Sequence, residues 1–330
     1  MADGHRVAVY YQTQYDRTLA SNSDYGHYVS PLPLITFITH LILAAFHINM
    51  NLPTTIALND YSPDNPYFDQ MWEDIGIMKQ AGIKVIGMLG GAAPGTYECL
   101  TPANFDTYYP QLTAYIAKYE LDGMDLDVEQ AESLADIINF IQHLKADFGD
   151  DFIITLAPVA SALTESGNLS GFDYIQLEES IGNHISWYNA QFYSGFGYIY
   201  PDDQYIDILN YGTGLDPSRL VATSLTSAAN GGGYIAIDEV VTAVNMLTAL
   251  YGDKFGGVAG WEYFNSVPDY AGGEPWQWAE TMQGAMNGSV ISNSSRLDGV
   301  LKKDTRREVS RIRGRATLRA EGSDVSDEES

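Results

Sequence analysis

The sequence contains little cysteine and little positive charge. One cysteine, Cys99, occurs in 330 residues, which excludes an internal disulfide and a metal site built from several thiolates. Only 17 lysine and arginine residues stand against 43 aspartate and glutamate residues, so the formal net charge is −26. A surface of this charge repels phosphate backbones and anionic lipids. We therefore expect no nucleic-acid partner and no membrane partner, whereas an uncharged ligand such as a sugar meets no such repulsion.

A long hydrophobic run is also missing. The longest apolar stretch, from Leu32 to Phe46, has about 15 residues, fewer than the roughly 18 that a membrane-spanning helix needs. The N-terminus does not show the cationic start and apolar core of a signal peptide. These absences predict a cytoplasmic protein, or a secreted one if a leader was removed.

Charge is distributed unevenly along the chain. A basic cluster from Lys302 to Arg319 precedes an acidic, serine-rich end, and neither part has a periodic apolar pattern. Such a composition is typical of a solvated segment. We therefore predict a single folded domain over residues 5–287 and a disordered, basic-then-acidic C-terminal tail over residues 288–330.

Within the predicted domain, short apolar runs alternate with longer segments at helical spacing. The runs predicted to be strands are Val7–Tyr11, Leu41–Phe46, Val85–Leu89, Gly123–Val128, Phe152–Ala157, Ile185–Tyr193, Leu220–Ser224 and Gly257–Trp261. The segments predicted to be helices are Tyr67–Gln80, Phe105–Tyr119, Leu134–Phe148, Tyr174–Glu179 and Val240–Tyr251. Eight βα-like units in about 280 residues favour the α/β class and a (β/α)8 TIM barrel. An open, doubly wound sheet is the alternative, but no Gly-x-Gly-x-x-Gly follows the first strand.

The most informative segment runs from Asp122 to Glu129 and reads DGMDLDVE. Side chains alternate between the faces of a strand, so Asp125, Asp127 and Glu129 share one face and the apolar residues between them share the other. Burying even one unpaired carboxylate is costly, and packing alone does not explain three in a row. We expect them to point into the barrel. Two alternatives are a solvent-facing edge strand and a calcium or magnesium site made by the same carboxylates.

Closely spaced carboxylates can perform acid–base chemistry. Their mutual repulsion raises one pKa and leaves a neutral acid beside a charged neighbour. This arrangement suits the cleavage of a glycosidic bond, in which a carboxylic acid protonates the leaving oxygen. Glu129, nearest the C-terminal end of the strand, is the predicted proton donor. Asp127, one inward position deeper, is predicted to orient and stabilise charge, with Asp125 supporting it.

The segment from Asp122 to Glu129 resembles the Asp-Gly-x-Asp-x-Asp-x-Glu signature of the family 18 glycoside hydrolases, the family of chitinases and endo-β-N-acetylglucosaminidases. Three further segments resemble motifs of that family: Met88–Gly91, Gln191–Tyr193 and Trp261. The resemblance extends from about Val7 to Ala285. Longer blocks are similar to the fungal endo-β-N-acetylglucosaminidases of the Endo T type, namely His40–Asn49, Met78–Gly95, Trp187–Gly197 and Gly257–Asn265.

The resemblance implies a retaining mechanism in which the 2-acetamido group of the substrate acts as the nucleophile, a known exception to the two-carboxylate scheme. Glu129 would serve as acid and then base, Asp127 would hold the acetamido N–H, and Asp125 would tune Asp127. The resemblance also implies hydrogen bonds from Tyr193 and Gln191 to the acetamido group. The residues that it implies for substrate binding are Trp261, Tyr10, Phe46, Asp122, Gly90 and Gly91. It implies no metal and no cofactor.

Three functions remain open at this stage. The first is an endo-β-N-acetylglucosaminidase that cleaves the di-N-acetylchitobiose core of N-glycans and glycoproteins. The second is a chitinase that acts on β-1,4-linked GlcNAc oligomers with the same residues, and the third is a glycan-binding lectin on an inactive barrel. His40 and His47 are expected to be structural residues, and a monomer is expected because no long amphipathic or heptad segment is present.

Overall fold

The structure is a computed structural model, and it describes residues 5–19, 21, 23–164, 166–212, 214–266 and 273–288. The predicted tail begins at residue 288, and residues 289–330 lie outside the described residues. The tail and the predicted domain boundary therefore stay predictions.

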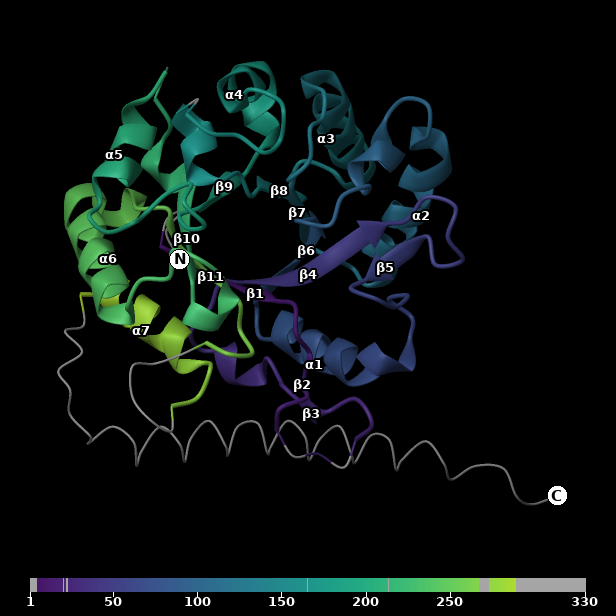
Figure 1. The fold of residues 1–330 in the computed structure, drawn as a ribbon, viewed down its shortest axis with the longest axis horizontal. Helices are drawn as coiled ribbons and strands as arrows, with labels where there is room; N and C mark the ends of the chain where they lie inside the picture. Colours follow the sequence, from purple (N-terminus) through teal and green to yellow (C-terminus); the bar gives the residue numbers. More distant parts are fainter. Residues whose placement is uncertain are drawn as a thin grey trace. The chain divides into compact units, whose positions relative to one another are not determined.

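Eight parallel strands form a closed barrel (Figure 1). They are β1 (Arg6–Tyr11), β4 (His40–Ile48), β6 (Lys84–Gly90), β7 (Gly123–Asp127), β8 (Ile153–Leu156), β9 (Trp187–Gln191), β10 (Leu220–Leu225) and β11 (Gly257–Trp261). Closure is achieved by β1, which pairs in parallel with both β11 and β4. A further strand, β5 (Ile56–Leu58), pairs antiparallel with the end of β4. The predicted (β/α)8 barrel is confirmed.

Helices surround this ring of strands (Figure 1). They are α1 (Asp69–Gln80), α2 (Phe105–Lys118), α3 (Leu134–Phe148), α4 (Tyr174–Ile181), α5 (Asp203–Asn210), α6 (Ile237–Tyr251) and α7 (Gln277–Met286). Between β1 and β4 the described residues form a small antiparallel hairpin, β2 (Tyr15–Asp16) with β3 (His27–Tyr28), where the regular pattern would have a helix. None of the helices in the described part of the chain is long and apolar enough to cross a membrane.

Local sequence explains why these elements form. In α3, Ile137, Phe140, Ile141 and Leu144 are buried, the spacing of one helix face. Ser133 caps its N-terminus by accepting a hydrogen bond from the backbone N–H of Asp136. In β7 the side chains alternate between two faces: Met124 and Leu126 are fully buried on one face, and Asp125 and Asp127 take the other. The barrel interior is filled mainly by apolar side chains, among them Tyr10, Ile42, Ile86, Met88, Trp187 and Val221.

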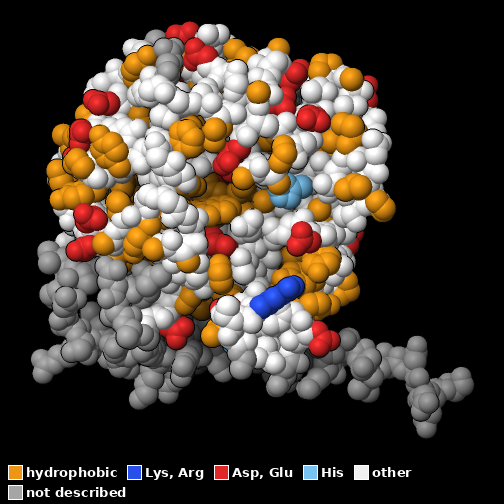
Figure 2. Space-filling model, in the orientation of Figure 1, with side chains coloured by type: hydrophobic (Ala, Val, Ile, Leu, Met, Phe, Trp, Pro, Cys, Tyr) orange, Lys and Arg blue, Asp and Glu red, His pale blue; other side chains and the backbone are white. Residues whose placement is uncertain are grey.

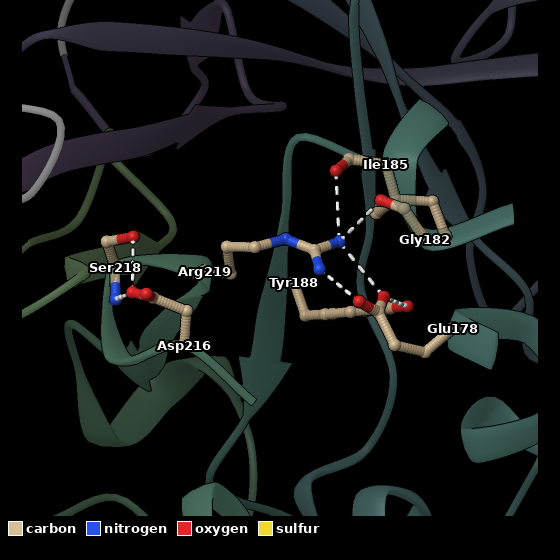
Figure 3. A network of polar contacts seen from close by, with 7 residues as sticks. All are labelled: Glu178, Gly182, Ile185, Tyr188, Asp216, Ser218 and Arg219. Carbon is tan, nitrogen blue, oxygen red and sulfur yellow. Dashed lines mark hydrogen bonds and ion pairs between the residues drawn. The ribbon is translucent and has the colours of Figure 1, made fainter. Parts of the chain in front are cut away.

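A polar network stabilises the end of the barrel where the strands begin (Figure 3). Arg219 directly precedes β10, and its guanidinium forms an ion pair with both carboxylate oxygens of Glu178 on α4. The same guanidinium donates to the carbonyl oxygens of Gly182 and Ile185, at 2.9 and 3.0 Å. Tyr188 of β9 donates its hydroxyl to Glu178 at 2.8 Å. These contacts join the segments that lead into β9 and β10.

Candidate active site

A cavity of about 430 Å³ opens where the barrel strands end. It is lined by residues at or beyond the ends of seven barrel strands, the arrangement expected at the C-terminal face of such a barrel. Figure 2 shows a hollow near the middle of one face, with hydrophobic side chains at its base and acidic side chains beside it. The lining residues include Gly90, Gly91, Asp127, Glu129, Gln191, Tyr193 and Trp261. Seven of the residues predicted from the sequence therefore meet in one place.

Asp125 lies beneath this cavity and is fully buried. Its carboxylate accepts three hydrogen bonds: from Tyr10 at 2.8 Å, from Thr155 at 2.6 Å and from Asn189 at 3.0 Å. Burial raises the pKa of Asp125, and the three hydrogen bonds oppose this increase because they stabilise the ionised form. Both oxygens are occupied by protein donors, so this carboxylate supports the site from below.

Asp127 lies above Asp125 and next to Glu129. Burial raises the pKa of Asp127 well above its ordinary value, and the negative charges of Glu129 and Asp125 raise it further. The amide nitrogen of Gln191 contacts both upper carboxylates, at 3.0 Å from Asp127 and 3.3 Å from Glu129, and also donates to the Ala157 carbonyl at 2.8 Å. Asp127 therefore keeps a proton at a pH at which an exposed aspartate is ionised. Asp127 and Glu129 thus line the cavity together, and Asp125 lies beneath them.

Aromatic side chains complete the cavity. Burial, followed by the charges of Asp127 and Glu129, raises the pKa of Tyr193 well above its ordinary value, so its hydroxyl remains a donor. Trp261, half-buried at the end of β11, lines the cavity and packs edge-on against Tyr10 at a centroid distance of 5.3 Å. Tyr10 was predicted to contact substrate, but it is fully covered and bonds to Asp125. It supports Trp261 and Asp125 from beneath the cavity.

Two of the predicted substrate-binding residues lie elsewhere. Asp122 precedes β7, at the opposite end of the barrel from the cavity, and its carboxylate accepts hydrogen bonds from the Lys84 side chain and the Val85 backbone N–H, both at 2.9 Å. Phe46 packs behind the sheet, with its ring 3.0 Å from the position that a Cβ atom would take on Gly87. The structure removes both from the candidate substrate contacts.

The position of Phe46 has a physical cause. The pairing of β4 with β6 shifts by one residue between Leu43 and Phe46, so every later side chain of β4 changes face. Ala45 and His47 line the cavity as a result, and Phe46 turns outward.

Gly90 and Gly91 allow close approach of the backbone at the end of β6. The backbone N–H of Gly91 donates to the Asp127 carbonyl at 2.9 Å, and both glycines have positive φ angles, +96° and +94°. A Cβ atom on Gly90 would lie 2.4 Å from the Asp127 carbonyl oxygen and 2.6 Å from the Tyr97 ring. The predicted site thus depends on glycine at this position.

Replacing Gly90 by alanine is expected to lower the free energy of unfolding by about 3 kcal/mol or more, because left-handed strain of about 1–2 kcal/mol adds to a steric overlap with backbone. Gly82 is the matched control: its φ is +91°, but no atom lies within 4 Å of its Cβ position. Gly82→Ala should therefore cost only the strain. Chemical denaturation of both variants measures the difference, and equal losses would show that the overlap at Gly90 is relieved.

Several residues that line the cavity or support Asp125 beneath it were not predicted. Thr155 and Asn189 occupy inward positions on β8 and β9, each two residues from another inward position, so strand alternation could have identified them. Gln12 and His47 line the cavity from the ends of β1 and β4, and no sequence motif marks them. The prediction that His47 is only structural is not supported by this position. Half-buried His40, by contrast, bonds to Thr39 and packs against Trp187.

The arrangement of the possible ligand side chains does not indicate a metal site. Among the residues that the structure describes, no three His, Cys, Asp or Glu side chains gather as metal ligands would. The absence of a cofactor and of a metal in the reaction stays a prediction.

Comparison with known proteins shows the family to which this site belongs. A family model described as glycosyl hydrolases family 18 matches residues 6–311. The solved structure of chitinase ChiC from Aspergillus fumigatus is 46% identical, with a TM-score of 0.74 over 86% of this chain and 99% of that chain. A fungal endo-β-N-acetylglucosaminidase from glycosyl hydrolase family 18 is 44% identical, with a TM-score of 0.79 and the same two coverages.

Curated relatives are more distant. Endochitinase A of Aspergillus niger is 27% identical over 58% of this chain, and Endochitinase A1 of Aspergillus fumigatus is 26% identical over 63%. The matched regions span only 17% and 27% of the lengths of those two proteins.

Proposed function

Because the chain belongs to glycoside hydrolase family 18, we propose that it is an endo-β-N-acetylglucosaminidase that cleaves the β-1,4 bond of the di-N-acetylchitobiose core of N-glycans. The observation that carries this proposal is the convergence of Asp127, Glu129, Gln191 and Tyr193 on one cavity. A proton donor, a charge-stabilising acid and two groups suited to an acetamido side chain meet there. Glycan release requires all of these functions.

The proposed reaction has two steps. In the first, Glu129 gives its proton to the glycosidic oxygen while the 2-acetamido carbonyl oxygen of the bound sugar attacks the anomeric carbon. The C–O bond to the leaving sugar breaks, and an oxazolinium ion forms. In the second, water attacks the anomeric carbon, Glu129 takes up the water proton, and the ring of the intermediate opens with retained configuration.

The surrounding residues have separate tasks in this scheme. In its ionised form, Asp127 accepts the acetamido N–H and stabilises the positive charge of the intermediate, and its buried position makes this interaction strong. Tyr193 donates its hydroxyl to the acetamido oxygen. Trp261 offers an aromatic face to the apolar side of the sugar ring.

A second observation favours the N-glycan core over a linear polymer. A larger cavity of about 710 Å³ adjoins the first, and the two share Gln12, His47 and Ala93. A branched glycan needs such a wide region beside the scissile bond. Chitinase activity with the same residues is the second candidate, supported by the 46% identity to a chitinase of known structure.

The test offers a high-mannose glycoprotein and chitin oligomers to the purified protein in parallel. We expect a mass loss equal to the glycan less one GlcNAc, because cleavage within the chitobiose core leaves that sugar on the protein. Mass spectrometry of the glycoprotein and chromatography of the oligomers measure both reactions. Cleavage of the oligomers alone would exchange the order of the two candidates. A glycan analogue without the 2-acetamido group is the control, and its hydrolysis would contradict the proposed mechanism.

A further inference from the structure

The second cavity is reached through a short junction. Of the described residues that line it, only Gln12, His47 and Ala93 also line the catalytic cavity. Gln12 and Ala93 follow β1 and β6, and His47 lies near the end of β4; these three strands are neighbours on one side of the barrel. Leu169 and Phe196, which follow β8 and β9, line the catalytic cavity only. A ligand that fills both cavities therefore has to pass these three residues.

The position of Glu129 determines how the sugar ring is oriented in the catalytic cavity. The anomeric carbon must lie beside Glu129, since that carboxyl protonates the leaving oxygen. Carbon 4 lies at the opposite end of a pyranose ring, so a chain linked through O4 leaves the catalytic cavity on the side away from Glu129. The junction lies on that side, two strands away from β7 around the barrel at His47.

The chemistry of His47 suits a sugar hydroxyl. Its side chain is half-buried, and its Nδ1 atom lies 3.5 Å from Thr96 Oγ1. Burial lowers the pKa of His47, although the charge of Asp60 opposes this decrease. The ring is therefore neutral near pH 7, with one N–H donor and one nitrogen acceptor. A hydroxyl group can use either.

We propose that His47 is a specificity-determining residue that hydrogen-bonds the sugar linked through O4 to the sugar in the catalytic cavity. This inference rests on the proposed function, which places the reacting sugar beside Glu129. Through this contact, His47 makes affinity depend on the part of the substrate that enters the second cavity. The adjacent Asp60 and Asp16 of that cavity make it suited to an uncharged glycan.

The test uses two stable thiazoline analogues of the oxazolinium ion and measures their dissociation constants by calorimetry. One is GlcNAc-thiazoline, which fills only the catalytic cavity, and the other carries a mannose linked β-1,4 to the same ring. His47→Ala should weaken the disaccharide about fivefold to tenfold, the size of one lost hydrogen bond, and change the monosaccharide less than twofold. His47→Gln should restore most of the loss. His27→Ala, an exposed histidine on β3 outside both cavities, is the matched control.

Each outcome decides between the possibilities. Equal weakening of both analogues would assign His47 a structural role, and unchanged binding of both would remove it from the site; either result overturns the inference. A wild-type protein that binds the monosaccharide but gains nothing from the added mannose would overturn it too. If the wild-type protein binds neither analogue, the proposed function itself fails.

Discussion

Replacement of Glu129 by glutamine is expected to lower kcat for glycoprotein deglycosylation by about 10³-fold, within the range that positioned general acids supply. Glutamine retains the shape of the side chain and can still contact Gln191, but it has no proton to give to the leaving oxygen. Binding should therefore remain: the dissociation constant of GlcNAc-thiazoline should change by less than fivefold. Initial-rate kinetics and calorimetry measure the two effects on the same preparation.

Glu132→Gln is the matched control for this variant. Glu132 lies three residues further along the chain, bonds to Gln130 and does not line the cavity. Its replacement makes the same chemical change without touching the reacting atoms, so kcat should stay within twofold of the wild-type value. Substantial activity in the Glu129→Gln variant would show that another group protonates the leaving oxygen.

Asp127→Asn is expected to lower kcat/KM by about 10²- to 10³-fold, the effect of removing one preorganised electrostatic partner from a buried site. The neutral amide keeps the size of the side chain, but it no longer stabilises the positive charge of the oxazolinium ion. Initial rates with the glycoprotein substrate measure the loss. Asp122→Asn is the control, because Asp122 is at the other end of the same segment and should leave kcat/KM within twofold.

The Asp127→Asn variant should also change the pH dependence of the free energy of unfolding. The folded-state pKa of Asp127 is raised well above its ordinary value of 3.8, so the native protein holds this proton to a higher pH than the unfolded chain does. This contribution to the free energy of unfolding is present below pH 3.8 and decreases as pH rises through the folded-state pKa. Asp127→Asn should remove the decrease and raise Tm at pH 7. A lower Tm at that pH would indicate that the activity loss reflects misfolding.

The sequence was most informative where alternation is regular. In β7 the acids at every second position face inward, and period-2 reasoning alone is enough to place Asp125 and Asp127 together. In β4 the same reasoning put Phe46 in the site, although its ring faces the helices. One extra residue in the pairing with β6 reverses the faces, and no local feature of the sequence marks that shift. Register between strands is a tertiary property, so the sequence could not reveal it.

The elements that were not predicted share another cause. α5 and α7 have only eight and ten residues, which is short for a helix to be recognised by periodicity alone, and packing on the barrel determines them. The hairpin of β2 and β3 has only two residues in each strand, too few for a pattern. Gln12 lies beyond the end of β1, where the position of a side chain depends on the neighbouring strands. The sequence motifs therefore identified the residues suited to catalysis, whereas only the tertiary structure showed which other residues line the cavity.

The Arg219–Glu178 network has a consequence for altering this protein. It ties together the starts of β9 and β10, whereas the candidate site depends on segments that follow the strands. Changes to the mouth of the barrel leave these anchoring contacts untouched. The loops around the second cavity are thus suitable for exchange or randomisation in a search for new glycan preferences. The Arg219–Glu178 network would continue to stabilise the opposite end of the barrel.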